Sequence, residues 1–401
     1  MSHSSFALSN LRAAVIVIVL FFHSCVAYLA SAPQPIPFNQ PPFAWQAFPI
    51  VDAHRWLGFD VFCATQDVNL MALMFFLSGL FVAPSLARKG AWTYFYDRVR
   101  RIGVPFLLAV AFLSPLALYP AYSTRTLDPS LADFWKQWMS LPFWPSGPEW
   151  FLWQLMVINV MAAALYAVVP DIIGPFRRFA AWAGTRPLKY FAVLCAGSLI
   201  AYAPLAFVYS PWSWTGFGPL VFQYCRPLIY ILMFFFGFAI GSEGLGRGLL
   251  ACDGPLARHW AWWTAAAAGS FCVWAGITAL TMPDWATANL AARIGAILSY
   301  PIACVAGGLF MLSVFLRFSR RRSWVLDSLS ANAYGMYLVH YVFAVWLQYA
   351  LMSSDLHATV KTMIVFAGVL PLSWAISAGF NRLLAGSSAV ATKRPIWTVS
   401  R

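Results

Sequence analysis

Long apolar runs alternate with short polar connections along the whole chain. A helix needs about 20 apolar residues to cross a bilayer, and windows of that kind predict ten membrane spans. They lie at about residues 11–31, 67–87, 102–122, 148–170, 190–208, 224–242, 260–281, 292–316, 331–351 and 360–380. The pattern therefore predicts an all-α polytopic membrane protein with about ten transmembrane helices.

The positive charges support one orientation of these spans. With the N-terminus in the cytoplasm, 20 of the 26 Lys and Arg residues fall on the cytoplasmic side, as the positive-inside rule expects. Both termini are then cytoplasmic. Because topology and contacts with anionic membrane lipids account for the net charge of +13, nucleic acid is not expected as a partner. The six outer cations are Arg55, Arg125, Lys136, Arg226, Arg293 and Lys361.

The composition indicates one membrane domain without a soluble part. The 401 residues are 61% hydrophobic and 10% charged, whereas soluble domains are about half apolar and a quarter charged. We expect a single integral-membrane domain over 1–401, with its core at about 8–380 and a short basic cytoplasmic tail at 381–401. The seven cysteines include no C-x-x-C pair, so no metal site is expected. A disulfide between Cys63 and Cys225 on the outer side is left open.

Two connections on the outer side have distinctive sequences. Residues 32–66 open with PQPIPFNQPP, whose proline density predicts an extended segment instead of a helix. Residues 123–147 predict an interfacial helix that places Trp135, Trp138 and Trp144 at the lipid headgroups. A platform for stacking sugars is the alternative interpretation of these tryptophans.

Two glycines lie in similar apolar runs. LMFFLSGLF contains Gly79 and LMFFFGFAI contains Gly237. Small residues let helix backbones approach closely in lipid, so we expect close helix packing at both positions.

The first span, LRAAVIVIVLFFHSC, contains an arginine at its start and a histidine about halfway along. Arg12 and His23 are eleven residues apart, which places them on one helix face about 16 Å from each other. An ionisable group deep in a membrane is costly and usually faces a cavity or a partner. A structural histidine that joins two helices is the alternative. An A-x-A pattern at 27–32 follows, but the apolar run is longer than a usual leader peptide.

A second histidine lies at a similar depth in the ninth span. ANAYGMYLVHYVF places Tyr334, Tyr337 and His340 along one side of a helix. Two imidazoles at the same depth exceed what packing requires, so we expect His23 and His340 to belong to one site. The span at 148–170 is the other polar one, with Asn159 inside it, while no acidic residue clearly lies inside any span.

Arginines precede the third span, in YFYDRVRRIGVP. Arg98 and Arg101 are three residues apart and would share a face at a helix start. Guanidinium groups bind phosphates through paired hydrogen bonds, so this pair is a candidate for binding phosphates from the cytosol. Charges that only orient the helix are the alternative.

Taken in order, these motifs resemble the membrane-bound acyltransferase-3 superfamily. The motifs are LR with ten residues before H, then FFLSG, R..RI..P, WFL and YGMYLVH, and they extend over about residues 8 to 380. DRVRRIGVP with GPEWFLW is closest to the branch that modifies periplasmic glucans. The chain departs from the family pattern in LSN before Leu11, where many members have an acidic residue and glycine, and in Glu149, which matches a family glutamate poorly.

The resemblance implies an enzyme, a transferase of the bacterial inner membrane. Such enzymes move an acyl group from cytoplasmic acyl-CoA to a hydroxyl of a glycan or other acceptor at the outer face. Arg12 and His23 would be the essential pair, Arg98 and Arg101 would bind the donor phosphates, and His340 would belong to the late Tyr–His motif with Tyr337. Acetyl-CoA and succinyl-CoA are the candidate donors, and no metal is implied.

Acyl transfer to an alcohol needs a base, a positioned carbonyl and a hydrogen-bond donor for the oxyanion. We expect His23 to be the general base, with Tyr337, His340 or Asn159 orienting it or donating to the oxyanion. Transfer through an acyl-histidine stays open. The competing classes are a proton-coupled transporter or flippase of an anionic glycan or lipid, and a structural subunit.

Overall fold

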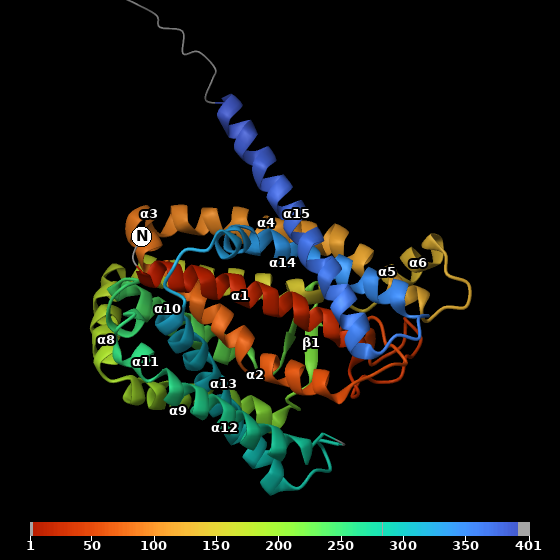
Figure 1. Cartoon of the computed structure of the whole chain (residues 1–401), viewed down its shortest axis with the longest axis horizontal. Coiled ribbons are helices and arrows are strands. Elements are labelled where there is room, and N and C mark those ends of the chain that lie inside the picture. Colours follow the sequence, from red (N-terminus) through yellow and green to blue (C-terminus); the bar gives the residue numbers. More distant parts are fainter. Residues whose placement is uncertain (1–2, 283, 392–401) are drawn as a thin grey trace, which may run out of the picture.

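The computed structural model describes residues 3–282 and 284–391, with side chains as far as residue 383. Its regular structure is almost entirely helical, which confirms the predicted all-α polytopic class (Figure 1). A short antiparallel hairpin, β1 (Trp214–Phe217) with β2 (Leu220–Gln223), interrupts the helices. The helices are α1 (His3–Cys25), α2 (Leu57–Gly79), α3 (Val82–Arg98), α4 (Val104–Leu108), α5 (Ser114–Ser123), α6 (Leu131–Ser140), α7 (Trp150–Val168), α8 (Ile173–Thr185), α9 (Pro187–Val208), α10 (Pro227–Glu243), α11 (Pro255–Arg258), α12 (Trp260–Ala279), α13 (Leu290–Phe318), α14 (Trp324–Leu351) and α15 (Ala358–Ala391).

Each of the ten predicted spans overlaps one of these helices. Within the described residues, seven helical segments are long and apolar enough to cross a membrane. An eighth is added if α10 and the helical segment Gly248–Arg258, which meet at an angle of 85°, form one broken span. Helices α12 and α14 are not among these segments, so the count of ten spans stays a prediction. The predicted cytoplasmic tail contains Lys393, Arg394 and Arg401, which lie outside the described residues.

The predicted start of the second span, at residue 67, is wrong. Helix α2 begins at Leu57, and its candidate span includes two acidic residues, contrary to the expectation that none lies inside a span. Asp60 accepts hydrogen bonds from the backbone N–H groups of Ala30 and Ser31 at 2.8 and 2.9 Å. Asp67 forms an ion pair of 2.7 Å with the buried Arg226. Because both carboxylates have partners, the helix can contain these charges, although they lower the hydropathy of the segment.

The third span belongs to a longer, irregular helical segment from Val82 to Ser123. The backbone turns at Gly90, whose φ of 75° favours glycine. Two π-helical turns follow, at Val99–Gly103 and Ala109–Leu113. π turns in α-helices are frequent at functional sites, and the first of these contains part of the arginine motif.

The predicted close packing at the two glycines is confirmed. A Cβ at Gly237 would lie 2.0 Å from the backbone oxygen of Phe76, and one at Gly79 would lie 2.1 Å from that of Phe234. Helices α2 and α10 therefore approach each other closely at these positions, where glycine leaves room for the opposite backbone.

The proline-rich connection forms an outer strap, defined here as residues 26–56. It contains short turns and no long helix, as predicted, whereas residues 57–66 of the predicted connection belong to α2. Arg125 donates to the carbonyl oxygens of Pro49 and Phe48 at 2.7 and 3.1 Å. Burial lowers the pKa of Arg125 to about 10, so the side chain stays cationic at neutral pH.

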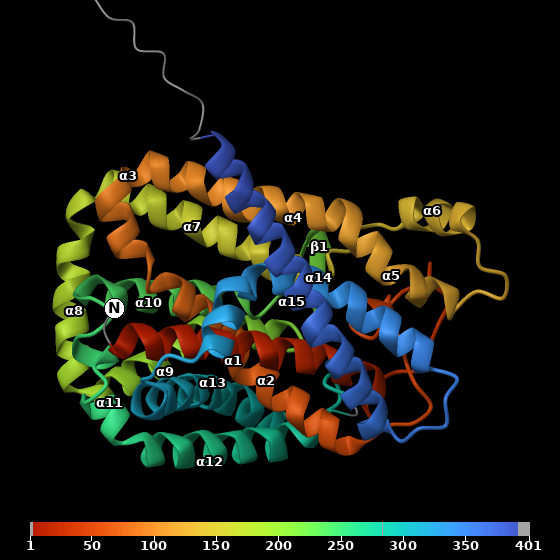
Figure 2. The same ribbon diagram turned by 45° about the horizontal axis from the view of Figure 1, so that its top comes forward.

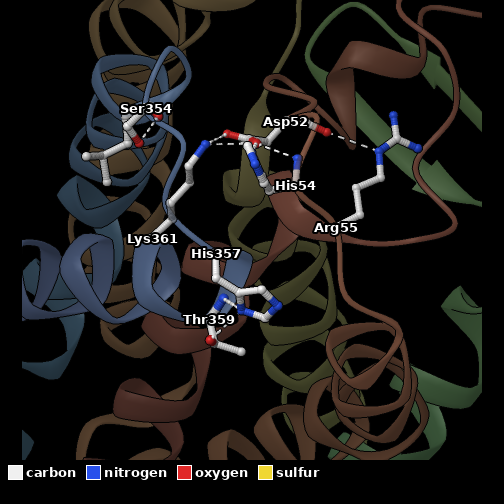
Figure 3. Close-up of polar contacts among 8 residues, drawn as sticks. Asp52, His54, Arg55, Ser354, His357, Thr359 and Lys361 are labelled. Carbon is white, nitrogen blue, oxygen red and sulfur yellow. Dashed lines mark hydrogen bonds and ion pairs between the residues drawn. The ribbon is translucent and has the colours of Figure 1, made fainter.

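A buried ion pair binds the outer strap to α15. Lys361 Nζ lies 3.0 and 2.8 Å from the two carboxylate oxygens of Asp52, and both side chains are fully buried (Figure 3). Asp52 also accepts the backbone N–H of His54 at 2.8 Å and donates its own N–H to Ala27 at 2.9 Å. Several of the cations predicted to lie on the outer side thus bind protein groups.

The two ends of the bundle differ in what they contain. The N-terminus, α8 and the start of α3 lie at one end, and the outer strap and α6 lie at the other (Figures 1 and 2). Helix α6 forms where an interfacial helix was predicted, but Trp138 is too buried to lie at the lipid headgroups. Trp135 is 41% exposed, whereas Trp138 is 1% exposed because it packs among other aromatic rings. Trp144 donates its indole N–H to Val110 at 2.9 Å.

Candidate functional site

Two histidines from different helices meet inside the bundle. Helices α1 and α14 lie side by side (Figures 1 and 2), and His340 Nε2 is 3.1 Å from His23 Nδ1. The predicted common depth of the two imidazoles is confirmed. His340 is fully buried, whereas His23 is partly exposed. Helix α1 begins at His3 and ends at Cys25, both earlier than the predicted bounds of 11 and 31, so His23 lies in its last turn instead of halfway along it.

The hydrogen bonds of the pair assign a tautomer to each neutral ring. His340 Nδ1 is 2.6 Å from the carbonyl oxygen of Tyr337, and His23 Nδ1 is 3.0 Å from that of Val19. A carbonyl oxygen only accepts hydrogen bonds, so both Nδ1 atoms carry hydrogen. The single hydrogen on His23 Nδ1 is then shared between two acceptors, the Val19 carbonyl oxygen and His340 Nε2, and His23 Nε2 keeps its lone pair. The exposed imidazole therefore presents a basic nitrogen.

Aromatic rings pack against this pair, and a buried carboxyl group lies in the segment that one of them binds. The ring of Tyr341 faces that of His23 edge-on, with centroids 5.3 Å apart. The hydroxyl of Tyr337 donates to the carbonyl oxygen of Pro148, which joins α14 to the turn before α7. The next residue, Glu149, is only 2% exposed. No role was predicted for Glu149, which directly follows the residue that Tyr337 binds.

The predicted arginines lie apart from the histidine pair. Arg12 is exposed, and its guanidinium carbon is 6.0 Å from the ring centroid of Phe81. Arg98 is half-buried, with its guanidinium carbon 4.7 Å from the ring centroid of Tyr94, and Arg101 is exposed. Arg12 and Arg101 are thus exposed and accessible to an anionic ligand.

Two expectations about this region need correction. Arg98 and Arg101 do not share a face of a regular α-helix, because the π turn at Val99–Gly103 widens the helix between them. Asn159 does not contact the histidines, since its side chain accepts the Tyr94 hydroxyl and donates to a carbonyl of its own helix at 2.7 Å. Asn159 therefore supports the ring on which Arg98 packs.

Sequence reasoning missed a glutamine on α14. Gln348, 1% exposed, donates from Nε2 to the carbonyl oxygens of His23 at 2.7 Å and of Ser24 at 3.2 Å. An amide in the otherwise apolar run YVFAVWLQYAL, eight residues after His340, was the available signal.

The cysteines and acidic residues add no further centre. All seven cysteines are free, so the disulfide between Cys63 and Cys225 that the sequence left open is not formed. The two belong to different apolar clusters. Within the described part of the chain, no group of three or more His, Cys, Asp or Glu side chains is arranged to hold a metal ion.

These features define a polytopic membrane protein whose helices surround a polar site built on two histidines. A family model described as an acyltransferase domain matches residues 6–378. The chain therefore belongs to the acyltransferase-3 family, which confirms the resemblance seen in its motifs and indicates acyl transfer as its general chemistry. No curated protein and no solved structure matches it.

Proposed function

We propose that the protein is a membrane-bound O-acyltransferase. It takes an acyl group from cytoplasmic acyl-CoA and transfers it to a hydroxyl of a glycan or other acceptor at the outer face. The observation that supports this most is the partly exposed imidazole of His23, whose Nε2 keeps a lone pair while Nδ1 donates to His340 at 3.1 Å. General-base catalysis needs a neutral nitrogen of this kind within reach of a hydroxyl.

In the proposed reaction, His23 Nε2 removes the proton of the acceptor hydroxyl as its oxygen attacks the thioester carbonyl. The C–O bond forms, and the tetrahedral intermediate then breaks its C–S bond. CoA leaves as a thiolate and receives the proton held on Nε2, which returns His23 to its neutral form. The contact with His340 stabilises the transient positive charge on His23, because a hydrogen bond to a charged donor is stronger than one between neutral groups.

The arginines suit the other end of the donor. Arg12 is eleven residues from His23 on the same helix, a rise of about 16 Å. A donor with its phosphates near Arg12, Arg98 and Arg101 would keep these charges outside the membrane while its thioester extends toward the histidines. Acetyl-CoA and succinyl-CoA are the proposed donors. Tyr337 acts as a structural partner of the site through its bond to Pro148.

The proposed location is the bacterial inner membrane, with the N-terminus in the cytoplasm. The motifs DRVRRIGVP and GPEWFLW support a periplasmic glucan as the acceptor. Trp56 of the outer strap and Trp135 of α6, which are 45% and 41% exposed, provide apolar ring faces at that end of the bundle, and such faces suit sugar rings.

Inside-out membrane vesicles test the proposal against transport. They receive [14C]acetyl-CoA or [14C]succinyl-CoA on the exposed cytoplasmic face, with and without a protonophore. We expect base-labile label on luminal carbohydrate, unchanged by the protonophore and absent without the protein. Movement of a glycan or lipid that requires a proton gradient and no acyl-CoA would instead identify a transporter.

A further inference from the structure

The last turn of α1 depends on another helix for its hydrogen bonds. The final carbonyl groups of any helix lack partners within that helix, and buried carbonyl groups need partners elsewhere. The carbonyl oxygens of His23 and Ser24 both accept from the amide of Gln348, at 2.7 and 3.2 Å. One buried side chain therefore satisfies two carbonyl groups at the helix end.

Helix α14 consequently binds the same residue of α1 at two points. His340 contacts the imidazole ring of His23 at 3.1 Å, and Gln348 binds its backbone carbonyl at 2.7 Å. A side chain attached to a fixed backbone can still rotate, and a fixed ring can still shift with its helix end. The two contacts together restrict both movements of the basic nitrogen.

We infer that Gln348 is a positioning residue that fixes the end of α1, and so the place of His23 Nε2 relative to His340. This inference rests on the proposed function of His23 as the base. A misplacement of about 1 Å can cost about a hundredfold in rate, so loss of this contact should lower kcat. Donor binding depends on the arginines at the other end of the bundle, so the KM for acyl-CoA should stay unchanged.

The test replaces Gln348 by methionine, which keeps the length of the side chain and removes its hydrogen-bond donors. The control is Gln154→Met, the same change at a residue that is 4% exposed and whose Nε2 has no hydrogen-bond partner among the described residues. His23→Ala is measured alongside. Vesicles with [14C]acetyl-CoA and [14C]succinyl-CoA give kcat and KM, and each rate is divided by the amount of monodisperse protein in detergent.

We expect Gln348→Met to lower kcat about 10- to 100-fold, with KM within about twofold of the wild type and Gln154→Met close to the wild type in both. An unchanged kcat per folded protein, or a change confined to KM, overturns the inference. If Gln348→Met yields no folded protein, Gln348→Asn replaces it, because asparagine keeps the amide on a shorter side chain. The same fall in kcat with an unchanged KM is then expected. Full activity of His23→Ala would refute the proposed function itself, whatever Gln348 does.

Discussion

Replacing His340 by phenylalanine separates the role of the buried imidazole from that of the exposed one. Phenylalanine keeps an aromatic ring at a fully buried position and removes the Nε2 atom that accepts from His23 at 3.1 Å. The bond from His23 Nδ1 to Val19, at 3.0 Å, remains. The base should therefore keep its tautomer and lose only the partner that stabilises its charge.

The size of the effect follows from the change in charge during the reaction. A hydrogen bond between neutral groups contributes about 0.5–1.5 kcal/mol, and one to a charged group about 1.5–3 kcal/mol. The contact between the two imidazoles would therefore gain about 1–1.5 kcal/mol when His23 becomes cationic in the transition state. At about 1.36 kcal/mol per factor of ten, kcat should fall about 5- to 15-fold. Removal of the base itself, in His23→Ala, should cost about 100- to 10,000-fold.

The assay measures the transfer of labelled acyl groups from acyl-CoA to luminal carbohydrate in inside-out vesicles. Each rate is divided by the amount of folded protein. His259→Phe is the control, because His259 is exposed and its Nδ1 lies 2.7 Å from the carbonyl oxygen of Pro255, much as His340 Nδ1 lies 2.6 Å from that of Tyr337. The reasoning is refuted if His340→Phe is as inactive as His23→Ala, since His340 would then do more than stabilise a charge. It is also refuted if His340→Phe retains the wild-type kcat.

Three further changes test other parts of the structure. Lys361→Met should lower the thermal unfolding midpoint in detergent, because it leaves the buried charge of Asp52 unpaired, which costs about 3–5 kcal/mol. Adding Asp52→Asn should restore much of the loss, and additive losses in the double variant would contradict a buried pair. Gly237→Ala should reduce the yield of folded protein, because its Cβ would lie 2.0 Å from a backbone oxygen of α2. Gly308→Ala is the control, because a Cβ there meets nothing within 4 Å. Equal yields of the two variants would contradict the packing account. Arg98→Lys should raise the KM for acyl-CoA about tenfold with little change in kcat, because lysine lacks the paired geometry for phosphate; an unchanged KM would exclude Arg98 from donor binding.

The histidine pair could be predicted from the sequence because burying an imidazole in a membrane costs free energy in any fold. An ionisable side chain in an apolar helix needs a partner, and counting residues from the helix start places His23 and His340 at similar depth. Both helices begin earlier than the predicted spans, at His3 instead of 11 and at Trp324 instead of 331, so the two errors largely cancel and the relative depth is kept. The contact distance and the tautomers required the structure.

Other features depend on contacts between segments far apart in the chain. The start of α2 was missed because Asp60 and Asp67 lower the local hydropathy, and only the fold shows that Asp60 binds backbone N–H groups and that Arg226 neutralises Asp67. The π turn that separates Arg98 from Arg101 leaves no simple periodicity in the sequence. Gln348 reads as one polar residue in an apolar run until α1 is placed beside it.

The most direct test of the account is the amount of base-labile acyl ester on outer-surface carbohydrate of host cells. Cells that lack the protein are compared with cells that regain it as wild type, His23→Ala or His259→Ala at equal membrane levels. The account predicts that wild type and His259→Ala restore the ester and that His23→Ala does not. Full restoration by His23→Ala would show that the imidazole is structural and would contradict the proposed chemistry.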